Sequence, residues 1–393
     1  MRILMLTHEF PPYRGGIGTY TAQLATAAYE LGNEVVVVAP DFGKDLTITD
    51  KAEYPFQVER FSSSTYNYRK LPSLLWRAWE QCRRTDFDLL HTVDPSFTMA
   101  LACVNNFVRV PFVATAYGTE ILSLRVSRQA SLLRTGDLFE KATAVFAISD
   151  YTKSLLTGHC RRVDANRIRV TPLGVDEYWF GKEDDYTKIR DMFEIPYDHR
   201  MILTVARLDE RKGHVTVLNG ISALSNLLKR NLTYVIVGSG SEGDHVARLH
   251  QRAQACGCRV VFIEDAPRDL LRQLYATADV FCMPGELHPK KVEGFGLAYL
   301  EAAAQGVPSI GSRAGAVPEV VRHEETGLLI EPGNELMFTR SLDRMLTDHG
   351  YRRTLGNNAK EWARNFTWRR CTELTYGQVN PVSEVLKSDA VER

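Results

Sequence analysis

Short apolar runs alternate with longer amphipathic segments along the whole chain. Apolar runs flanked by turn residues are typical of strands buried on both faces of a parallel sheet. The first half of the chain has four such runs and the second half repeats the rhythm: Val35–Ala39, Leu89–Leu90, Phe112–Ala114, Val145–Ile148, Met201–Val205, Tyr234–Val237, Val260–Ile263 and Val280–Cys282. Strands that alternate with helices in two series predict an α/β protein with two doubly wound, Rossmann-like domains.

The two series are separated near Pro172–Asp176, and a polar stretch continues from there to Pro196. We therefore predict an N-terminal domain over 1–175 and a C-terminal domain over 176–374. Open parallel sheets bind ligands beyond the carboxyl ends of their strands, at a topological switch point. With two such domains, we expect the site in the cleft between them.

Composition and charge narrow the class of protein. The 393 residues carry 48 basic and 48 acidic side chains, a balance that argues against an extended nucleic-acid surface. No apolar run reaches the ~20 residues that a membrane-spanning helix needs. Met1–Leu6 is too short for a signal peptide, and we interpret it as the first strand. Seven cysteines without a framework spacing indicate reduced thiols and a cytoplasmic protein.

A glycine-rich turn precedes a helical segment and consists of Glu293, Gly294, Phe295, Gly296 and Leu297. Glycine lets the backbone approach a ligand closely, and the free N–H groups at a helix start carry a positive partial charge. Such a turn is suited to a pyrophosphate or to sugar hydroxyls. Glu301 follows in the same segment, roughly 12 Å from Glu293 if all the residues between them are helical. The alternative is a glycine-flanked helix start with two solvated glutamates.

Two further segments are typical of anion binding. Arg207 and Lys212 follow a predicted strand, and their charges are suited to a diphosphate. A second glycine-rich turn leads into a helix near the start of the chain and contains Gly15, Gly16 and Gly18. The alternatives are a solvated charged loop in the first case and a tight turn without a ligand in the second.

Together these segments resemble the retaining glycosyltransferases of family 4, which have the two-domain GT-B fold. The resemblance extends over nearly the whole chain and rests on six motifs in the family's order: the glycine turn at 15–18, Gly174–Asp176, Arg207 with Lys212–Gly213, Glu293 with Glu301, Gly315–Glu319 and Glu324–Leu329. Each motif alone is modest, whereas six in order are specific. The resemblance also implies that a C-terminal helix, at about 375–393, completes the first domain.

The resemblance implies three catalytic residues. Arg207 and Lys212 neutralise the diphosphate as the bond to the sugar breaks, while Glu293 holds hydroxyls of the donor sugar. Electrostatic stabilisation of the departing diphosphate is then the main catalytic effect.

The remaining matches imply donor-binding residues. The glycine turn, Gly16 above all, offers N–H groups to the phosphates, and the amides of 294–297 hold the donor sugar. Glu301 accepts hydrogen bonds from the ribose. The backbone of 261–265 borders the base, with Glu264 as the donor-binding residue there.

We therefore expect transfer of a hexose-type sugar from a UDP- or GDP-sugar to a glycan, a lipid-linked or a small-molecule acceptor. The resemblance implies retention at the anomeric carbon by a front-face path, which needs no carboxylate nucleophile. We expect no metal and no cofactor, since the nucleotide sugar is a substrate. Asp86–Asp88 matches the Asp-x-Asp of metal-dependent glycosyltransferases, but we interpret it as a polar entry to the next strand.

The first domain supplies the acceptor-side candidates. Family members often have a His-Gly step where this chain has Tyr117 and Gly118. Tyr117 can donate a hydrogen bond there but does not titrate near neutrality. Glu120 and His91 are the other acceptor-side candidates, with a structural role as the alternative for His91.

Two segments mix aromatic and basic residues, Tyr66–Arg84 and Leu122–Arg134. Such segments bind anionic lipid surfaces, and they predict peripheral contact with the inner face of a membrane. The alternative is a packed helix with solvated arginines.

Other enzyme and protein classes fit parts of the pattern. Val237–Gly243 matches the dinucleotide fingerprint of dehydrogenases, but it lies in the second domain, and family 4 has Gly-x-Gly after the same strand. A sugar-nucleotide epimerase, a phosphorylase or a non-catalytic sugar-nucleotide binder of the same fold are further alternatives. Turnover of a nucleotide sugar distinguishes them.

Overall fold

The structure is a computed structural model that describes residues 1–13, 15–63, 71–104, 107, 110–126, 139–160, 162–181, 187–240 and 243–377. The chain forms two compact units. The first consists of the residues up to Gly174 together with those from Thr367 onward, and the second of Val175–Phe366. The second unit is thus an insertion in the first. The sequence predicts a return to the first unit at about 375, and most of that predicted helix lies outside the described residues.

The first unit is built around a parallel sheet with the strand order β3-β2-β1-β4-β5-β6-β7 in its described part. These strands are β1 (Arg2–Leu6), β2 (Glu34–Pro40), β3 (Gln57–Phe61), β4 (Leu89–Thr92), β5 (Phe112–Ala116), β6 (Ala144–Ala147) and β7 (Ile168–Val170). The helices are α1 (Gly16–Glu30), α2 (Thr47–Glu53), α3 (Leu71–Cys82), α4 (Pro95–Cys103), α5 (Thr119–Val126), α7 (Asp150–His159) and α17 (Trp368–Tyr376). Strand order reverses between β1 and β4, which makes this the switch point of the sheet.

The second unit has a parallel sheet with the strand order β10-β9-β8-β11-β12-β13 among its described residues. Its strands are β8 (Arg200–Val205), β9 (Leu232–Val237), β10 (Arg259–Ile263), β11 (Val280–Met283), β12 (Ser309–Ser312) and β13 (Gly327–Ile330). The helices are α8 (Thr187–Met192), α9 (His214–Ser222), α10 (Asn226–Arg230), α11 (Gly243–Ala255), α12 (Arg268–Thr277), α13 (Leu297–Ala304), α14 (Val317–Val320), α15 (Glu335–Thr347) and α16 (His349–Ala363). The switch point lies between β8 and β11.

The fold class predicted from the sequence is confirmed, because both units are doubly wound parallel sheets. The apolar runs named above lie in strands, apart from Ile148, which follows β6, and most of their side chains are buried in the two cores. In the edge strand β10, residues 260–262 are only half-buried. Three strands lack a continuous apolar run, and nothing in the sequence predicts them: β3, β7 and β12.

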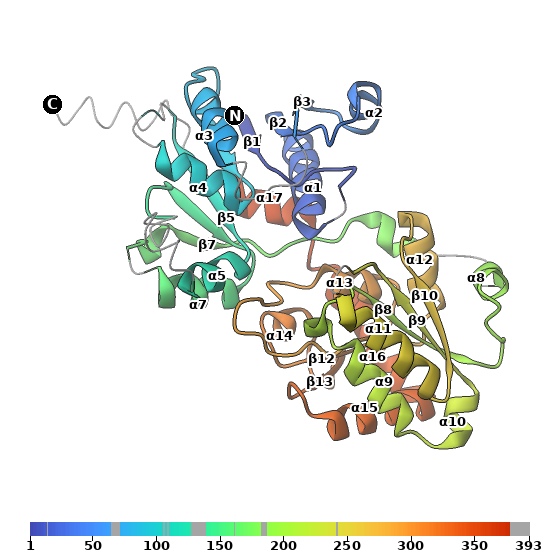
Figure 1. The fold of residues 1–393 in the computed structure, drawn as a ribbon. Coiled ribbons are helices and arrows are strands. Elements are labelled where there is room, and N and C mark those ends of the chain that lie inside the picture. Colours follow the sequence, from blue (N-terminus) through green and yellow to red (C-terminus); the bar gives the residue numbers. More distant parts are fainter. Residues whose placement is uncertain are drawn as a thin grey trace. The chain divides into compact units, whose positions relative to one another are not determined.

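Helix α17 belongs to the first unit and packs against α1 (Figure 1). The Trp368 ring lies 6.0 Å from the Tyr20 ring, centroid to centroid. Gly174 lets the chain pass this helix closely, because a Cβ there would lie 2.3 Å from the Trp368 nitrogen. Helix α17 is therefore a structural part of the first unit.

Candidate functional site

Charged side chains gather at the switch point of the second sheet. The turn after β8 carries Arg207, Arg211 and Lys212, and the loop after β11 carries Glu293. The carboxyl ends of adjacent parallel strands meet at one edge of a sheet, so the two segments lie together. This is the place where ligands of open α/β sheets bind.

Glu293 is held by two cations. Lys212 Nζ lies 2.5 Å from Glu293 Oε2, and Arg211 Nη1 lies 3.2 Å from the same oxygen. Burial alone would raise the pKa of Glu293, but the charges of Lys212 and Arg211 hold it below its ordinary value. Glu293 is therefore an ionised carboxylate, and the three side chains together carry one positive charge.

The turn that carries these cations is fixed by its backbone. The Arg211 N–H donates to Asp209 Oδ1 at 3.0 Å, and the Arg211 carbonyl accepts from the Glu286 N–H at 2.9 Å. Gly213 follows with φ +78°, and a Cβ there would lie 2.0 Å from the Pro284 carbonyl oxygen. Only glycine fits this position, because the left-handed conformation and the close approach both exclude a side chain.

Asp209 and Lys291 form a second ion pair beside the first, with 2.9 Å between Asp209 Oδ2 and Lys291 Nζ. Burial opposes ionisation of Asp209, but Lys291 and the Arg211 N–H hold its pKa below the ordinary value. The opposite charges of Asp209 and Lys291 cancel, so this pair adds no net charge to the cluster. Arg207 differs from these residues because it is exposed on the turn, where its guanidinium is accessible to an anionic ligand.

The glycine-rich segment after β11 delivers Glu293 to the start of α13. Gly296 is the N-cap of this helix, with φ +99° and no side-chain cap, so free N–H groups are present there. Phe295 is buried against Phe366, with 6.0 Å between ring centroids, and only its backbone is available to a ligand. Helix α13 begins at Leu297, so the separation estimated for a fully helical Glu293–Glu301 segment does not apply.

Glu301 lies in the second turn of α13 and accepts a hydrogen bond from the Tyr275 hydroxyl at 2.9 Å. Burial raises the pKa of Glu301 to about 7. The carboxyl group is thus poised to change charge near neutrality. Nearby, Asp176 of the Gly174–Asp176 motif pairs with Arg268.

Glu264 and Gly238 directly follow the strands β10 and β9 of the second unit. Glu264 is exposed at the carboxyl end of β10. Gly238, of the dinucleotide-like match, has φ +143°, and a Cβ there would lie 2.1 Å from the Ala206 carbonyl oxygen. This glycine is therefore required for packing against the turn that carries Arg207.

The glycine turn of the first unit opens α1. Gly15 is the N-cap and has no side-chain cap. Gly16 is exposed, and a Cβ at this position would meet no atom within 4 Å. Gly18 is buried and close to the Tyr13 carbonyl oxygen, at 3.2 Å from its added Cβ. The Glu9 carboxylate lies beside this helix start, with Oε2 2.8 Å from the position of a Cβ at Gly15, whereas the backbone at Gly16 is open to solvent.

Tyr117 and Glu120 lie together after β5. The Tyr117 hydroxyl donates to the Val93 carbonyl at 2.7 Å, and Glu120 Oε1 accepts from the Tyr117 N–H at 2.6 Å and from the Gly118 N–H at 3.2 Å. Burial raises the pKa values of both side chains. Both residues are partly exposed.

His91 lies elsewhere. It is fully buried, and both ring nitrogens have internal partners, with Tyr376 Oη at 2.7 Å and Thr115 Oγ1 at 2.8 Å. Burial lowers its pKa to about 3. A neutral histidine inside the core has no surface for an acceptor. We therefore remove His91 from the acceptor-side residues and assign it a structural role.

The two acids of Asp86–Asp88 lie at the amino edge of the first sheet. Asp88 Oδ2 accepts from the Arg2 N–H at 2.7 Å, and Asp86 Oδ2 pairs with the Arg2 guanidinium at 2.9 Å. Both carboxylates therefore bind Arg2 where β1 begins. This is the edge of the sheet opposite the carboxyl ends of the strands.

The two aromatic and basic segments are only partly described. Residues 64–70 and 127–138 lie outside the described residues. Helix α3 exposes Trp76 at its surface, 4.9 Å from the Trp79 ring, and Arg83 lies over the Trp79 ring at 4.7 Å. Across the parts of the chain that the structure describes, no helix is long and apolar enough to cross a membrane.

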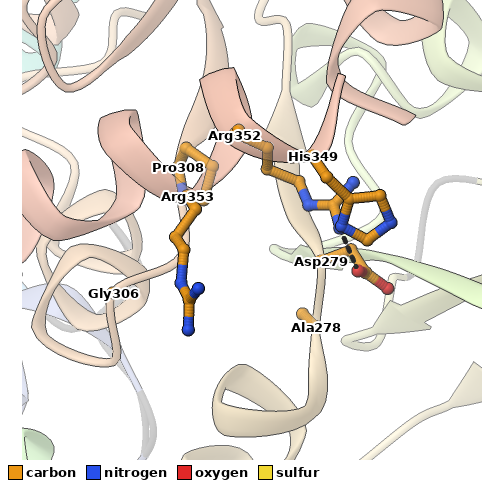
Figure 2. A pocket seen from close by; sticks show the side chains of 8 residues that line it. Ala278, Asp279, Gly306, Pro308, His349, Arg352 and Arg353 are labelled. Carbon is orange, nitrogen blue, oxygen red and sulfur yellow. Dashed lines mark hydrogen bonds and ion pairs between the residues drawn. The ribbon is translucent and has the colours of Figure 1, made fainter. Parts of the chain in front are cut away.

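A separate hollow of about 480 Å³ opens at the other edge of the second sheet (Figure 2). Its residues precede β11 and β12 or begin α16. Asp279 pairs there with Arg352 at 3.1 Å, and Arg353 points into the hollow from the same helix (Figure 2). The hollow lies at the amino ends of the strands, so it is distinct from the cluster around Glu293.

Sequence reasoning missed two residues of the site, Arg211 and Tyr275. Arg211 stands between two residues of the family pattern, and its burial depends on Glu293, which lies far away in the sequence. Tyr275 has no local signal, because an aromatic residue in an amphipathic helix predicts only core packing.

Family models match both halves of the chain. A model described as Glycosyltransferase Family 4 matches residues 14–178, and a model described as Glycosyl transferases group 1 matches residues 185–362. The two matches coincide closely with the two units of the structure. The match over 14–178 includes the glycine turn at 15–18. The match over 185–362 includes Glu293 and the cations Arg207, Arg211 and Lys212.

Known proteins resemble the chain over almost its full length. The GDP-mannose-dependent alpha-(1-6)-phosphatidylinositol monomannoside mannosyltransferase of Mycolicibacterium smegmatis is 29% identical, over 96% of this chain and 98% of that protein. Sucrose-phosphate synthase from Thermosynechococcus elongatus has a TM-score of 0.81 at 22% identity, over 99% of both chains. Anabaena Alr3699/HepE, solved in complex with UDP and glucose, has a TM-score of 0.77 at 22% identity, over 99% of this chain and 100% of that one.

Proposed function

Because the chain belongs to the family-4 glycosyltransferases with the GT-B fold, we propose that it is a retaining hexosyltransferase. Its donor is a nucleotide sugar, and we propose a UDP- or GDP-hexose. The observation that carries the proposal is the cluster of Arg211, Lys212 and Glu293 at the switch point of the second sheet.

The departing nucleotide diphosphate needs positive charge. We assign this role to Lys212 and Arg207, with the N–H groups of Gly15, Gly16 and Gly18 as further donors to phosphate. The net positive charge of the Lys212 cluster and the exposure of Arg207 support the assignment. Cations next to the diphosphate stabilise charge as it develops in the transition state, which is a large catalytic effect in a water-poor site. They also provide the charge that a metal ion supplies in other glycosyltransferases.

The donor sugar and ribose have separate partners in this proposal. Glu293 accepts hydrogen bonds from hydroxyls of the donor sugar, and the backbone N–H groups of 294–297 donate hydrogen bonds to them. Glu301 accepts hydrogen bonds from the ribose hydroxyls. The uncapped start of α13 supports the first contact. The raised pKa of Glu301 supports the second, since hydroxyl donors stabilise its ionised form. Glu264 is proposed at the base.

Retention follows a front-face path in which the acceptor oxygen attacks from the side that the diphosphate leaves. The bond between the anomeric carbon and the diphosphate oxygen breaks, and the acceptor proton passes to that oxygen. Glu293 is no nucleophile here. Its pairing with two cations supports this, because both lower the basicity of the carboxylate.

We propose an acceptor that is a glycan, a lipid-linked sugar or a small polyol, contacted by Tyr117 and Glu120. The name of the mycobacterial relative, a mannosyltransferase acting on a phosphatidylinositol mannoside, supports a lipid-linked acceptor. The exposed Trp76 on α3, with Arg83 nearby, supports peripheral contact with an anionic membrane.

The test is transfer by the purified full chain from radiolabelled UDP-glucose, UDP-galactose, GDP-mannose and UDP-N-acetylglucosamine to pooled glycan and lipid acceptors. We expect one donor to be consumed, with the anomeric configuration retained in the product by NMR. Donor binding without hydrolysis or transfer by any pair would refute an enzyme function, and an inverted product would refute retention.

A further inference from the structure

Two neighbouring cations of the second unit share one carboxylate oxygen. Lys212 Nζ and Arg211 Nη1 lie 2.5 Å and 3.2 Å from Glu293 Oε2. A largely buried carboxylate needs a cationic partner to stay ionised. Since Glu293 has two, one of them is available to another anion without leaving the carboxylate unpaired.

The two cations differ in how firmly they are held. Arg211 has a side chain that is 8% exposed, and its N–H and carbonyl are bound by Asp209 and Glu286 on the two sides of the turn. Its guanidinium is planar and always charged. Lys212 ends in a compact ammonium on a flexible stem. Lys212 is therefore the cation that can turn from Glu293 toward a ligand.

We infer that Arg211 is a positioning residue that keeps Glu293 ionised and in place while Lys212 moves from Glu293 to the donor diphosphate. The inference rests on the proposed function and deepens it. Arg211 acts through Glu293 and makes no contact with the donor. The adjacent cations thus divide two tasks that one cation could not perform at the same time.

The presence of Arg211 determines whether Glu293 takes up a proton when nucleotide binds. If Arg211 is absent, departure of Lys212 leaves Glu293 as an unpaired buried charge, and the carboxylate takes up a proton instead. Nucleotide binding then consumes a proton, and affinity falls as the pH rises. With Arg211 present, Glu293 stays ionised before and after binding, and this group exchanges no proton.

Calorimetric titration of the full chain with UDP and with GDP tests the inference. Repeating each titration in two buffers of different ionisation enthalpy gives the protons taken up per nucleotide. Between about pH 6 and 8 we expect Arg211→Gln to take up roughly half a proton more than the wild type, and its affinity to fall by roughly threefold per pH unit relative to the wild type. Arg211→Lys keeps the charge and should stay near the wild type. Arg353→Gln, at the other edge of the sheet, is the matched control.

Equal proton uptake by Arg211→Gln and the wild type would overturn the inference. So would a wild type that binds neither UDP nor GDP, because Lys212 would then have no diphosphate to reach. No turnover enters the measurement. A protein that binds nucleotide with the expected linkage but transfers no sugar would contradict the proposed function alone.

Lys212→Ala decides the matter if Arg211→Gln does not fold. Arg211 alone should then keep Glu293 ionised, so the unfolding free energy of Lys212→Ala should follow the pH dependence of the wild type. A group whose pKa is raised on folding loses stability as the pH rises. A steeper loss in Lys212→Ala between about pH 5 and 8 would mean that Glu293 is protonated, against the inference.

Discussion

The hydroxyl of Tyr376 lies 2.7 Å from Nδ1 of His91, in the interior of the first unit. Tyr376 belongs to α17, near the end of the described chain, and His91 belongs to β4 at the centre of the sheet. The Tyr376 and His91 rings also meet edge to face at 5.7 Å. A polar link surrounded by apolar side chains therefore ties the returning helix to the sheet.

We expect Tyr376→Phe to lower the free energy of unfolding by about 1–3 kcal/mol, because one nitrogen of a buried histidine loses its partner. The measurement is urea denaturation of the purified protein. Tyr29→Phe is the control, since Tyr29 is 44% exposed on α1. Equal stability of the two variants would contradict a structural role for the Tyr376–His91 bond.

His91 should make the protein sensitive to acid. Burial lowers its pKa to about 3, whereas the ordinary value is about 6.5. The unfolded state thus binds more protons between these values, so the stabilisation is complete above about pH 6.5 and is lost as the pH falls toward about 3. We expect His91→Gln to lose less stability than the wild type between about pH 7 and 5. His250→Gln, at an exposed position, is the control for replacing a histidine outside the core.

Gly213 follows Lys212 in its turn, whereas Gly333 lies elsewhere in the second unit. Replacing each glycine by alanine gives a matched test of whether the position of the turn matters. Their φ angles are +78° and +76°, but only at Gly213 would a Cβ collide with the Pro284 carbonyl, whereas nothing lies within 4 Å at Gly333. Gly333→Ala should cost about 1–2 kcal/mol. Gly213→Ala should cost about 1–3 kcal/mol more and should also abolish turnover, because the turn must shift. Full activity of Gly213→Ala would show that the position of the turn is unimportant.

Lys212→Ala should lower kcat roughly 10²- to 10³-fold, the loss expected when a group that stabilises transition-state charge is removed. The assay is initial-rate transfer with the donor identified in the panel. Lys51→Ala, on the exposed surface of α2, should leave the rate unchanged. If the two variants have the same rate, Lys212 does not act on the diphosphate.

Glu301 should make donor binding depend on pH. Its pKa is raised to about 7 by burial, and the ionised form accepts hydrogen bonds from ribose hydroxyls more strongly than the protonated form. The dissociation constant of a UDP- or GDP-hexose should therefore fall as the pH rises from about 6 to 8. Glu301→Gln should bind more weakly, with no such dependence. A wild-type dissociation constant that is constant over this range would argue against the ribose contact.

Much of the fold could be predicted from the pattern of apolar residues. Strands such as β2 and β9 are continuous apolar runs, and burial on both faces of a parallel sheet requires that pattern. Strand β12 could not be found in this way. Its sequence is Ser-Ile-Gly-Ser, and its burial depends on the neighbouring strands and on Tyr299, whose hydroxyl oxygen lies 3.0 Å from the position of a Cβ at Gly311.

The site was accessible to sequence reasoning only where spacing carries the information. Glu293, Glu301 and Lys212 stand in a family pattern. Arg211 does not, and a charged residue in a loop is exposed by default. Only the contact with Glu293 buries it. His91 shows the opposite error, because a histidine at a strand end predicts a ligand contact, whereas the partner Tyr376 comes from the far end of the chain.

The interruption of the first unit by Val175–Phe366 has a consequence during synthesis on the ribosome. Chains fold as they emerge, and domains fold as units. The second unit is complete once Phe366 has left the exit tunnel, whereas the first still lacks Trp368, Tyr376 and the rest of α17. The first unit, whose synthesis begins first, is therefore the unit that completes its folding last. A chain truncated directly after Phe366 should hold a folded second unit and a first unit that still lacks α17.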